Sequence, residues 1–192
     1  MKRVLVVSPG GMGCTFTLEV LRRAQIETND PYDADGLKHH WNPRDPRYQI
    51  FAPAKTVYVW NDPLAALLSI SRRGWLDDQA AKLGTKASGK TLSLRALWFE
   101  TSRAHRDTFG LERHVDLWVN MWPPSLFFLL DFRLLHVQLS NLADFLERER
   151  HALDDLRVHK RAQYDLRAIP SDVIDVYRTL DLKVRTICER WS

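Results

Sequence analysis

The stretch that decides the fold covers residues 4–15 and reads Val4-Leu5-Val6-Val7-Ser8-Pro9-Gly10-Gly11-Met12-Gly13-Cys14-Thr15. The continuous apolar run at its start is typical of a strand buried on both faces, as in a parallel sheet. The glycines let the backbone approach a ligand closely, and the apolar-periodic residues 16–23 predict a helix. Strand, glycine-rich turn and helix in this order direct N–H groups and a helix dipole at an anion. Residues 9–15 therefore predict a phosphate-binding loop, although a glycine-rich connection without a ligand shares the pattern.

The rest of the chain continues to alternate between strand and helix patterns. Further strands are predicted at 56–60 and 126–131, and helices at 91–106, 141–150 (capped by Ser140) and 171–190. Another helix should start at Pro63, capped by the residue before it, and stop at Gly74. Residues 29–47 and 82–90 have loop composition. This order predicts an α/β fold, a three-layer P-loop-like domain over residues 1–192, with helices on both faces of a central parallel sheet.

Two topological expectations follow from this fold. Residues 4–7 should form a strand in the middle of the sheet. The loops after Val7 and Trp60 should share the rim at the carboxyl ends of the strands, where ligands bind in such sheets.

Composition limits the classes of function. The formal net charge is +4 and the pI about 9.2, which fits an anionic small ligand. Basic and acidic residues are interspersed, so nucleic acid is not the expected partner. The two cysteines, Cys14 and Cys188, have neither disulfide-framework nor metal-ligand spacing. No apolar run approaches membrane-spanning length, and residues 4–7 are too few for a signal peptide. We expect a soluble, cytoplasmic protein without a membrane span or metal site.

Two further groups of residues can carry chemistry. Lys38-His39-His40 offers a cation and a base in a polar loop, although solvated loops often contain such residues. Asn61 follows a predicted strand, and Ser69 lies on the helix after it, followed by Arg72 and Arg73. Ser69 could donate to a phosphate. Without the other motifs, a helix cap and a surface serine would explain this second group equally well.

Taken in order, these motifs resemble the sulfotransferase family, whose members take a sulfuryl group from 3′-phosphoadenosine 5′-phosphosulfate. Residues 13–16, Gly-Cys-Thr-Phe, stand where that family has Gly-Thr-Thr-Trp, and residues 38–40 are similar to its Lys-Thr-His element. Asn61 takes the position of the arginine that binds the 3′-phosphate, and Ser69 follows eight residues later, as in the family. Residues 107–112, Trp118, 126–131 and 142–146 resemble the later core. The resemblance touches about three quarters of the chain.

The resemblance implies a role for each matching residue. His40 would be the catalytic base, and Lys38 would assist at the reacting centre. The acceptor would be a small molecule or glycan bearing a hydroxyl or amine. The nucleotide, bound as the sulfate donor or as the product 3′-phosphoadenosine 5′-phosphate, would contact a larger set: Gly10, Gly11, Met12, Gly13, Cys14, Thr15, Phe16, Asn61, Ser69 and Arg73.

The chain departs from the family at its cations. Gly10 or Gly11 replaces the loop lysine or arginine, Asn61 replaces the 3′-phosphate arginine, and no Arg-Lys-Gly element lies near the C-terminus. Five basic residues are candidates to substitute for them: Lys38, Arg72, Arg73, Lys86 and Lys90. Two alternatives therefore stay open. One is a phosphoryl-transfer enzyme on a P-loop-like fold, in which Asp62 could supply a carboxylate to a magnesium ion. The other is a non-catalytic protein that binds a nucleotide or a partner, for which Trp41 could line a surface.

Overall fold

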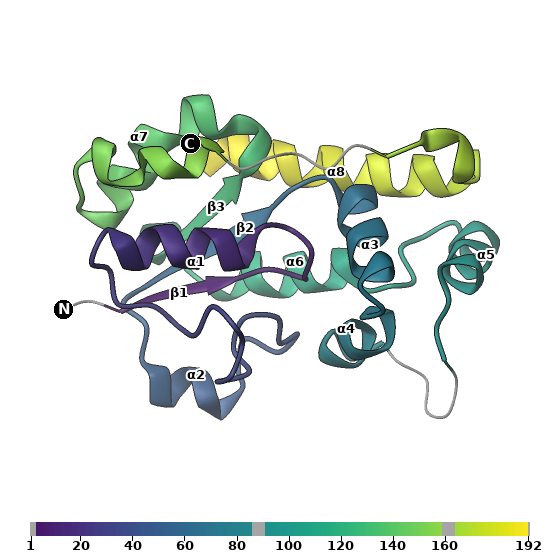
Figure 1. Ribbon diagram of the computed structural model, residues 1–192, viewed down its shortest axis with the longest axis horizontal. Helices are drawn as coiled ribbons and strands as arrows, with labels where there is room; N and C mark the ends of the chain where they lie inside the picture. Colours follow the sequence, from purple (N-terminus) through teal and green to yellow (C-terminus); the bar gives the residue numbers. More distant parts are fainter. Residues whose placement is uncertain (1–2, 86–90, 159–163, 192) are drawn as a thin grey trace.

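The computed structural model describes residues 3–85, 91–158 and 164–191, and its centre is a parallel sheet of three strands (Figure 1). Strand β1 (Val4–Val7) pairs with β2 (Lys55–Trp60), and β2 pairs with β3 (Phe127–Asp131). The order β1-β2-β3 makes β2 the central strand, so the expectation that residues 4–7 lie in the middle is wrong. The outer edge of β1 is covered by the segment around Thr28, which forms a parallel bridge to Val4.

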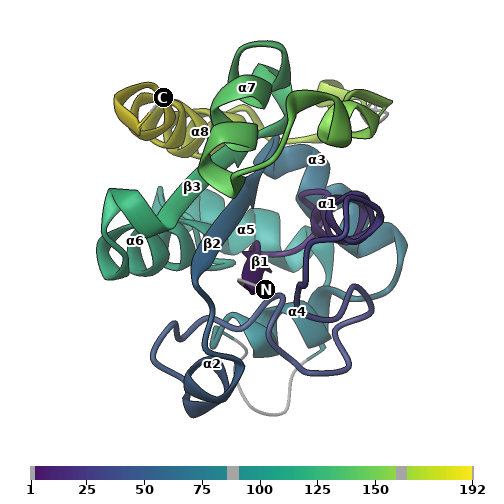
Figure 2. The same ribbon diagram turned by 90° about the vertical axis from the view of Figure 1, so that its left-hand side faces the viewer.

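Helices cover both faces of this sheet (Figure 2). Successive side chains of a strand point to opposite faces. Tyr58 of β2 contacts His114 on one face, and Trp60 on the same face donates a hydrogen bond to Asp181. On the other face, Phe128 of β3 packs on Phe145. The first two partners belong to α6 (Leu111–Met121) and α8 (Ser171–Trp191), and Phe145 belongs to α7 (Leu135–Leu146). The predicted α/β class with helices on both faces is confirmed.

The element after β1 is α1 (Cys14–Arg23), as predicted. The predicted loop at 29–47 is largely irregular but ends in a short helix, α2 (Pro46–Phe51), that the sequence pattern did not indicate. Asp45 caps α2 by accepting a hydrogen bond from the N–H of Arg47, and Pro46 occupies its first position.

Among the described residues between β2 and β3, four segments are α-helical. Helix α3 (Pro63–Arg72) begins as predicted, because the carboxylate of Asp62 accepts hydrogen bonds from two N–H groups of its first turn. Gly74, at φ +72°, follows its end. The three others are α4 (Leu76–Lys82), α5 (Leu94–Ala104) and α6. Only α5 was predicted, at 91–106. Lys86 and Lys90, in the predicted loop at 82–90, lie outside the described residues.

The chain on either side of β3 corrects two predictions. Leu126 belongs to the 3₁₀ turn η1 (Pro124–Leu126) rather than to the strand. A second turn, η2 (Phe132–Leu134), leads directly into α7, so Ser140 is a residue of the helix interior and not its cap. The buried Leu135, Leu139 and Leu142 continue one apolar stripe, which explains the early start. Two 3₁₀ segments, η3 (Arg150–Val158) and η4 (Leu166–Ala168), precede α8, which matches its predicted range.

The parallel register brings the ends of all three strands to one rim. Val7 lies beside Tyr58, and Trp60 lies beside Asp131. The glycine-rich loop and the segment after β2 therefore meet at this rim, as expected from the carboxyl-end rule. No helix among the residues that the structure describes has the length and apolar character needed to cross a membrane.

Candidate functional site

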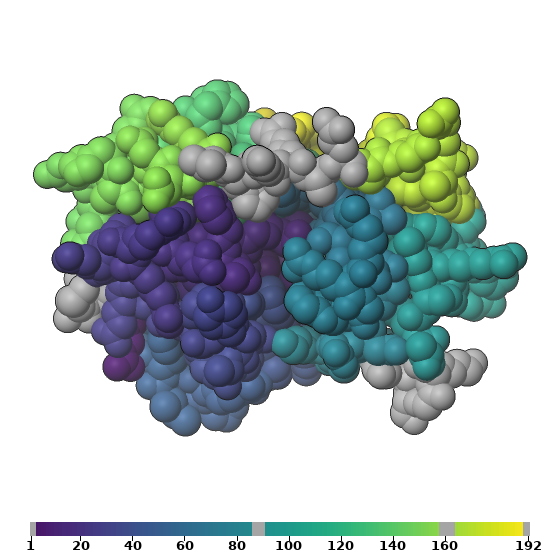
Figure 3. Space-filling view, in the orientation of Figure 1, coloured from purple at the N-terminus to yellow at the C-terminus, as the bar shows by residue number. Residues whose placement is uncertain are grey.

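A cavity of about 1010 Å³ opens at this rim. Its walls are the start of α1, the segment 31–39, and helices α3 and α4. Figure 3 shows the hollow between the purple surface of α1 and the blue surface of α3. Nine of the twelve site residues predicted from sequence line it: Gly11, Gly13, Cys14, Thr15, Phe16, Lys38, Asn61, Ser69 and Arg73. Gly10, Met12 and His40 do not.

The glycine-rich loop has a backbone that other residues adopt only with strain. Gly10, Gly11 and Gly13 have φ values of +95°, +67° and +97°. A Cβ on Gly11 would come within 2.8 Å of the carbonyl oxygen of Ala66 in α3. The loop thus packs directly on α3. Gly13 ends the loop as the first flanking residue of α1, and no described side chain caps this helix. The first N–H groups of α1 are therefore left for a ligand at the cavity.

Met12 and Gly10 serve the packing instead of lining the cavity, and Cys14 lines it but directs its thiol to the chain interior. Met12 is completely buried in the core. Gly10 is covered by Gln79, whose amide would lie within 2.6 Å of an added Cβ. The thiol of Cys14 points inward and lies 3.6 Å from the carbonyl oxygen of Val6. Burial raises the pKa of Cys14 to about 12, so this thiol is neither a thiolate nucleophile nor a substitute for the lysine of ordinary P-loops.

Lys38 brings a positive charge to the uncapped end of α1. Its side chain is buried, with 6% of the residue exposed, and its ammonium donates hydrogen bonds to the hydroxyl of Thr15 (3.0 Å) and to the carbonyl oxygen of Pro31. Both partners are neutral. A cation at the positive end of a helix dipole is unfavourable unless an anion joins it. This pairing of an ammonium with a helix N-terminus therefore favours an anion at this point of the cavity.

The two histidines diverge, and His39 rather than His40 reaches the cavity. Nδ1 of His39 lies 2.9 Å from the carbonyl oxygen of Ser8, so Nδ1 carries the proton and Nε2 keeps a lone pair. Burial lowers the pKa of His39 to about 4, which leaves the ring neutral at pH 7. No hydrogen bond occupies Nε2 among the residues described. The ring is thus arranged to accept a proton.

His40 points to the other side of the chain. Its Nε2 lies 3.5 Å from a carboxylate oxygen of Asp45, and its Nδ1 accepts a hydrogen bond from the N–H of Asn42. Its ring stacks on Trp41. Residues 38–39 form a turn, and the two neighbouring rings face different sides of the chain. The expected placement of His40 at the reacting centre is not found.

Helix α3 supplies the second polar wall. Ser69 and Arg73, four residues apart, line the cavity together. Arg73 stacks over the ring of Trp75 at 5.1 Å and has no ion pair within the described part of the chain. The side-chain oxygen of Asn61 accepts a hydrogen bond from the N–H of Asp62. The carboxylate of Asp62 in turn accepts a hydrogen bond from the hydroxyl of Tyr164, at 2.6 Å. These side chains present a hydroxyl, an amide and a guanidinium to the same space.

Sequence reasoning missed the residues of α4 and of the facing loop. Trp75, Asp78, Gln79 and Lys82 recur at helical spacing and line the third wall. Two aromatic residues of the lining are exposed, Trp75 at 51% and Tyr32 of the segment 31–39 at 80%. Large exposed aromatic residues at a cavity mouth offer stacking surfaces for a planar ligand. The helical spacing of residues 75–82 is the signal that could have found this wall.

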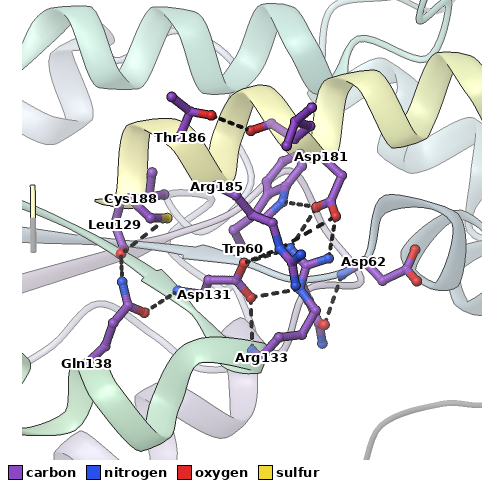
Figure 4. Close-up of polar contacts among 12 residues, drawn as sticks. Trp60, Asp62, Leu129, Asp131, Arg133, Gln138, Asp181, Arg185, Thr186 and Cys188 are labelled. Atoms are coloured by element: carbon purple, nitrogen blue, oxygen red, sulfur yellow. Dashed lines mark hydrogen bonds and ion pairs between the residues drawn. The ribbon is translucent and has the colours of Figure 1, made fainter. Parts of the chain in front are cut away.

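Arg133 lines the cavity and is held by two carboxylates (Figure 4). Its guanidinium bridges the buried carboxylate of Asp131 (2.6 Å) and that of Asp181 on α8 (2.5 Å). The indole N–H of Trp60 also donates to Asp181 at 2.9 Å. This network fixes the ends of β2 and β3 to α8. The charged groups of this network pair with one another, so the main effect of the network on the cavity is to hold the ends of the strands in place.

No model of a known protein family matches this chain, and no curated protein matches it. The chemistry of the cavity is therefore inferred from its own residues.

Proposed function

We propose that the cavity binds 3′-phosphoadenosine 5′-phosphosulfate and that the protein transfers its sulfuryl group to a hydroxyl or amine acceptor. The observation that carries the proposal is the convergence of Lys38 and the uncapped α1 N-terminus at one place, with Ser69 and Arg73 on a neighbouring wall. A donor with anionic groups at two positions matches two cationic positions in one cavity. The volume of about 1010 Å³ accommodates a ligand of nucleotide size.

The proposed reaction assigns a different base from the one that the motif implies. Nε2 of His39 takes the proton of the acceptor while the acceptor atom bonds to sulfur. The bond between sulfur and the bridging phosphate oxygen breaks, and 3′-phosphoadenosine 5′-phosphate leaves. Lys38 and the N–H groups of α1 offset the charge that develops on the bridging oxygen. An anion bound beside His39 would also raise its low pKa toward the working pH.

Phosphoryl transfer is the second candidate that the sequence left open. Asp62 would have to serve the magnesium ion, but its carboxylate already accepts hydrogen bonds from two N–H groups of α3 and from Tyr164. The geometry thus favours the sulfuryl donor over a magnesium nucleotide.

Calorimetry tests the donor assignment. The protein is titrated with 3′-phosphoadenosine 5′-phosphate and, separately, with ATP and magnesium. We expect the bisphosphate to bind without magnesium and the Ser69→Ala variant to bind it several-fold more weakly. Ser71→Ala is the matched control, because Ser71 lies on the same helix and does not line the cavity. Binding of ATP only with magnesium, or equal effects of the two serine variants, would contradict the assignment.

Transfer itself is tested with the two histidines. A set of hydroxyl and amine acceptors is incubated with the labelled sulfate donor, and transfer is compared in His39→Asn and His40→Asn. We expect the first variant to lose at least about a hundredfold in rate and the second to stay within a few-fold. If nucleotide binding persists but no acceptor is sulfated, the binding-protein alternative is correct.

A further inference from the structure

A second cavity, of about 930 Å³, lies on the other side of the chain segment that holds His39 and His40. It is bounded by residues 42–44, Thr85, residues 106–108 and one face of α6. The N–H of Trp41 donates to the carbonyl oxygen of Lys82, so the joined segments separate this cavity from the first. None of the residues proposed to contact the nucleotide lines it.

Three arginines face this second cavity, Arg44, Arg106 and Arg113. Within the described ranges none of them has a carboxylate within ion-pair distance. The remaining stretches, 1–2, 86–90, 159–163 and 192, contain no aspartate or glutamate side chain. The guanidinium of Arg113 lies over the ring of Trp41 at 4.6 Å, which holds it in place. Three guanidinium groups thus share one concave surface without carboxylate partners.

The carboxylates of the same wall are engaged elsewhere. Asp107 accepts hydrogen bonds from three N–H groups at the start of α6 and from the hydroxyl of Tyr177. Glu112 and Asp116 both pair with the ammonium of Lys183, at 2.9 and 2.8 Å. These carboxylates therefore bind partners other than the arginines, and with Lys183 counted, four cations stand against three carboxylates on this wall.

The other lining residues indicate which anion would fit. The hydroxyls of Thr85 and Thr108 already form hydrogen bonds within the chain, but the amide NH2 of Asn42 and the amide oxygen of Asn120 have no such partner among the described residues and can bind hydroxyl groups. Among the described residues, the lining contains no aromatic ring on which a nucleic-acid base would stack. Arginines bind sulfate and carboxylate groups in two-point contacts. We propose that this cavity binds an acidic saccharide, with its anionic groups on the arginines and its hydroxyls on the asparagine amides.

A binding experiment with a sulfated hexasaccharide derived from heparin tests this proposal. Calorimetry is run at about 0.15 M NaCl, where weak unspecific attraction is screened. The double variant Arg44→Ala with Arg106→Ala should bind at least about tenfold more weakly than the unmodified protein. The matched control is Arg95→Ala with Arg178→Ala, which removes the same charge from two exposed arginines outside the cavity. The control should change the affinity by less than about threefold.

Three results would overturn the proposal: no binding of the hexasaccharide by the unmodified protein, equal weakening in the two double variants, or tighter arginine-dependent binding of a single-stranded oligonucleotide of equal charge. Circular dichroism verifies that the variants fold. The affinity for 3′-phosphoadenosine 5′-phosphate should be the same in both double variants, because the nucleotide occupies the first cavity. Failure of saccharide binding and failure of nucleotide binding are therefore separate outcomes.

Discussion

Replacing Lys38 with methionine removes the buried positive charge at the start of α1 while keeping a side chain of similar length. In the structure the ammonium is held by the hydroxyl of Thr15 at 3.0 Å and by the carbonyl oxygen of Pro31, and neither partner carries a charge. We therefore expect the main loss to fall on anion binding. A hydrogen bond from a charged donor contributes about 1.5–3 kcal/mol.

This range corresponds to an affinity for 3′-phosphoadenosine 5′-phosphate that is about 10-fold to 100-fold weaker. Calorimetry on Lys38→Met measures the change directly, and Lys183→Met serves as the control, since Lys183 lies on α8 and pairs with Glu112 and Asp116 outside the cavity. Urea unfolding establishes that both variants are folded. An affinity within threefold of the unmodified protein would refute the reasoning, because Lys38 would then not contribute to the anion site.

Three further results are expected. In urea titrations, Gly11→Ala should reduce the free energy of unfolding by at least about 1 kcal/mol more than Gly74→Ala does. Both glycines have positive φ, but only an alanine at position 11 would press its Cβ against α3. Equal losses of unfolding free energy in the two variants would show that the loop can move away from α3. Iodoacetamide at a mildly basic pH should leave Cys14 unmodified in the native protein, because burial raises the pKa of its thiol to about 12; rapid native alkylation, read by mass spectrometry, would contradict this burial. Lowering the pH from about 7 to 5 should destabilise the protein by about 1–2 kcal/mol more than it destabilises His39→Asn. The unfolded histidine gains its proton near pH 6.5, whereas burial lowers the pKa of the folded one to about 4, so stability present above pH 6.5 is lost as the pH falls; parallel pH curves would show that His39 is not buried in this way.

The fold could be predicted where a local pattern suffices. The run Val4–Val7 specifies a strand, and the glycines that follow it specify a turn. The pair Asp62-Pro63 specifies a helix start. Helix α4 has only 7 residues, so the helical spacing of its cavity-lining residues is a short signal, and the helix was missed. The start of α7 was missed because strand β3 passes through a 3₁₀ turn into the helix without a linker.

The candidate site could be predicted at the strand ends but not within the loops. Parallel strands bring the glycine-rich loop and Asn61 to one rim whatever the loops do. The choice between His39 and His40 depends on the path of residues 30–39, which is set by tertiary hydrogen bonds such as that from the N–H of Ser8 to the carbonyl oxygen of Lys38. Packing likewise decided that Gln79 covers Gly10. Such contacts between distant segments leave no signal in a single sequence.

The central claim is that one cavity recognises two separate phosphate groups, and the most direct measurement compares 3′-phosphoadenosine 5′-phosphate with 5′-AMP by calorimetry. The account predicts that the bisphosphate binds at least about tenfold more tightly, that Arg73→Ala removes this preference, and that Arg72→Ala, a neighbour that does not line the cavity, retains it. Equal affinities for the two nucleotides, or a preference that survives in Arg73→Ala, would contradict the account.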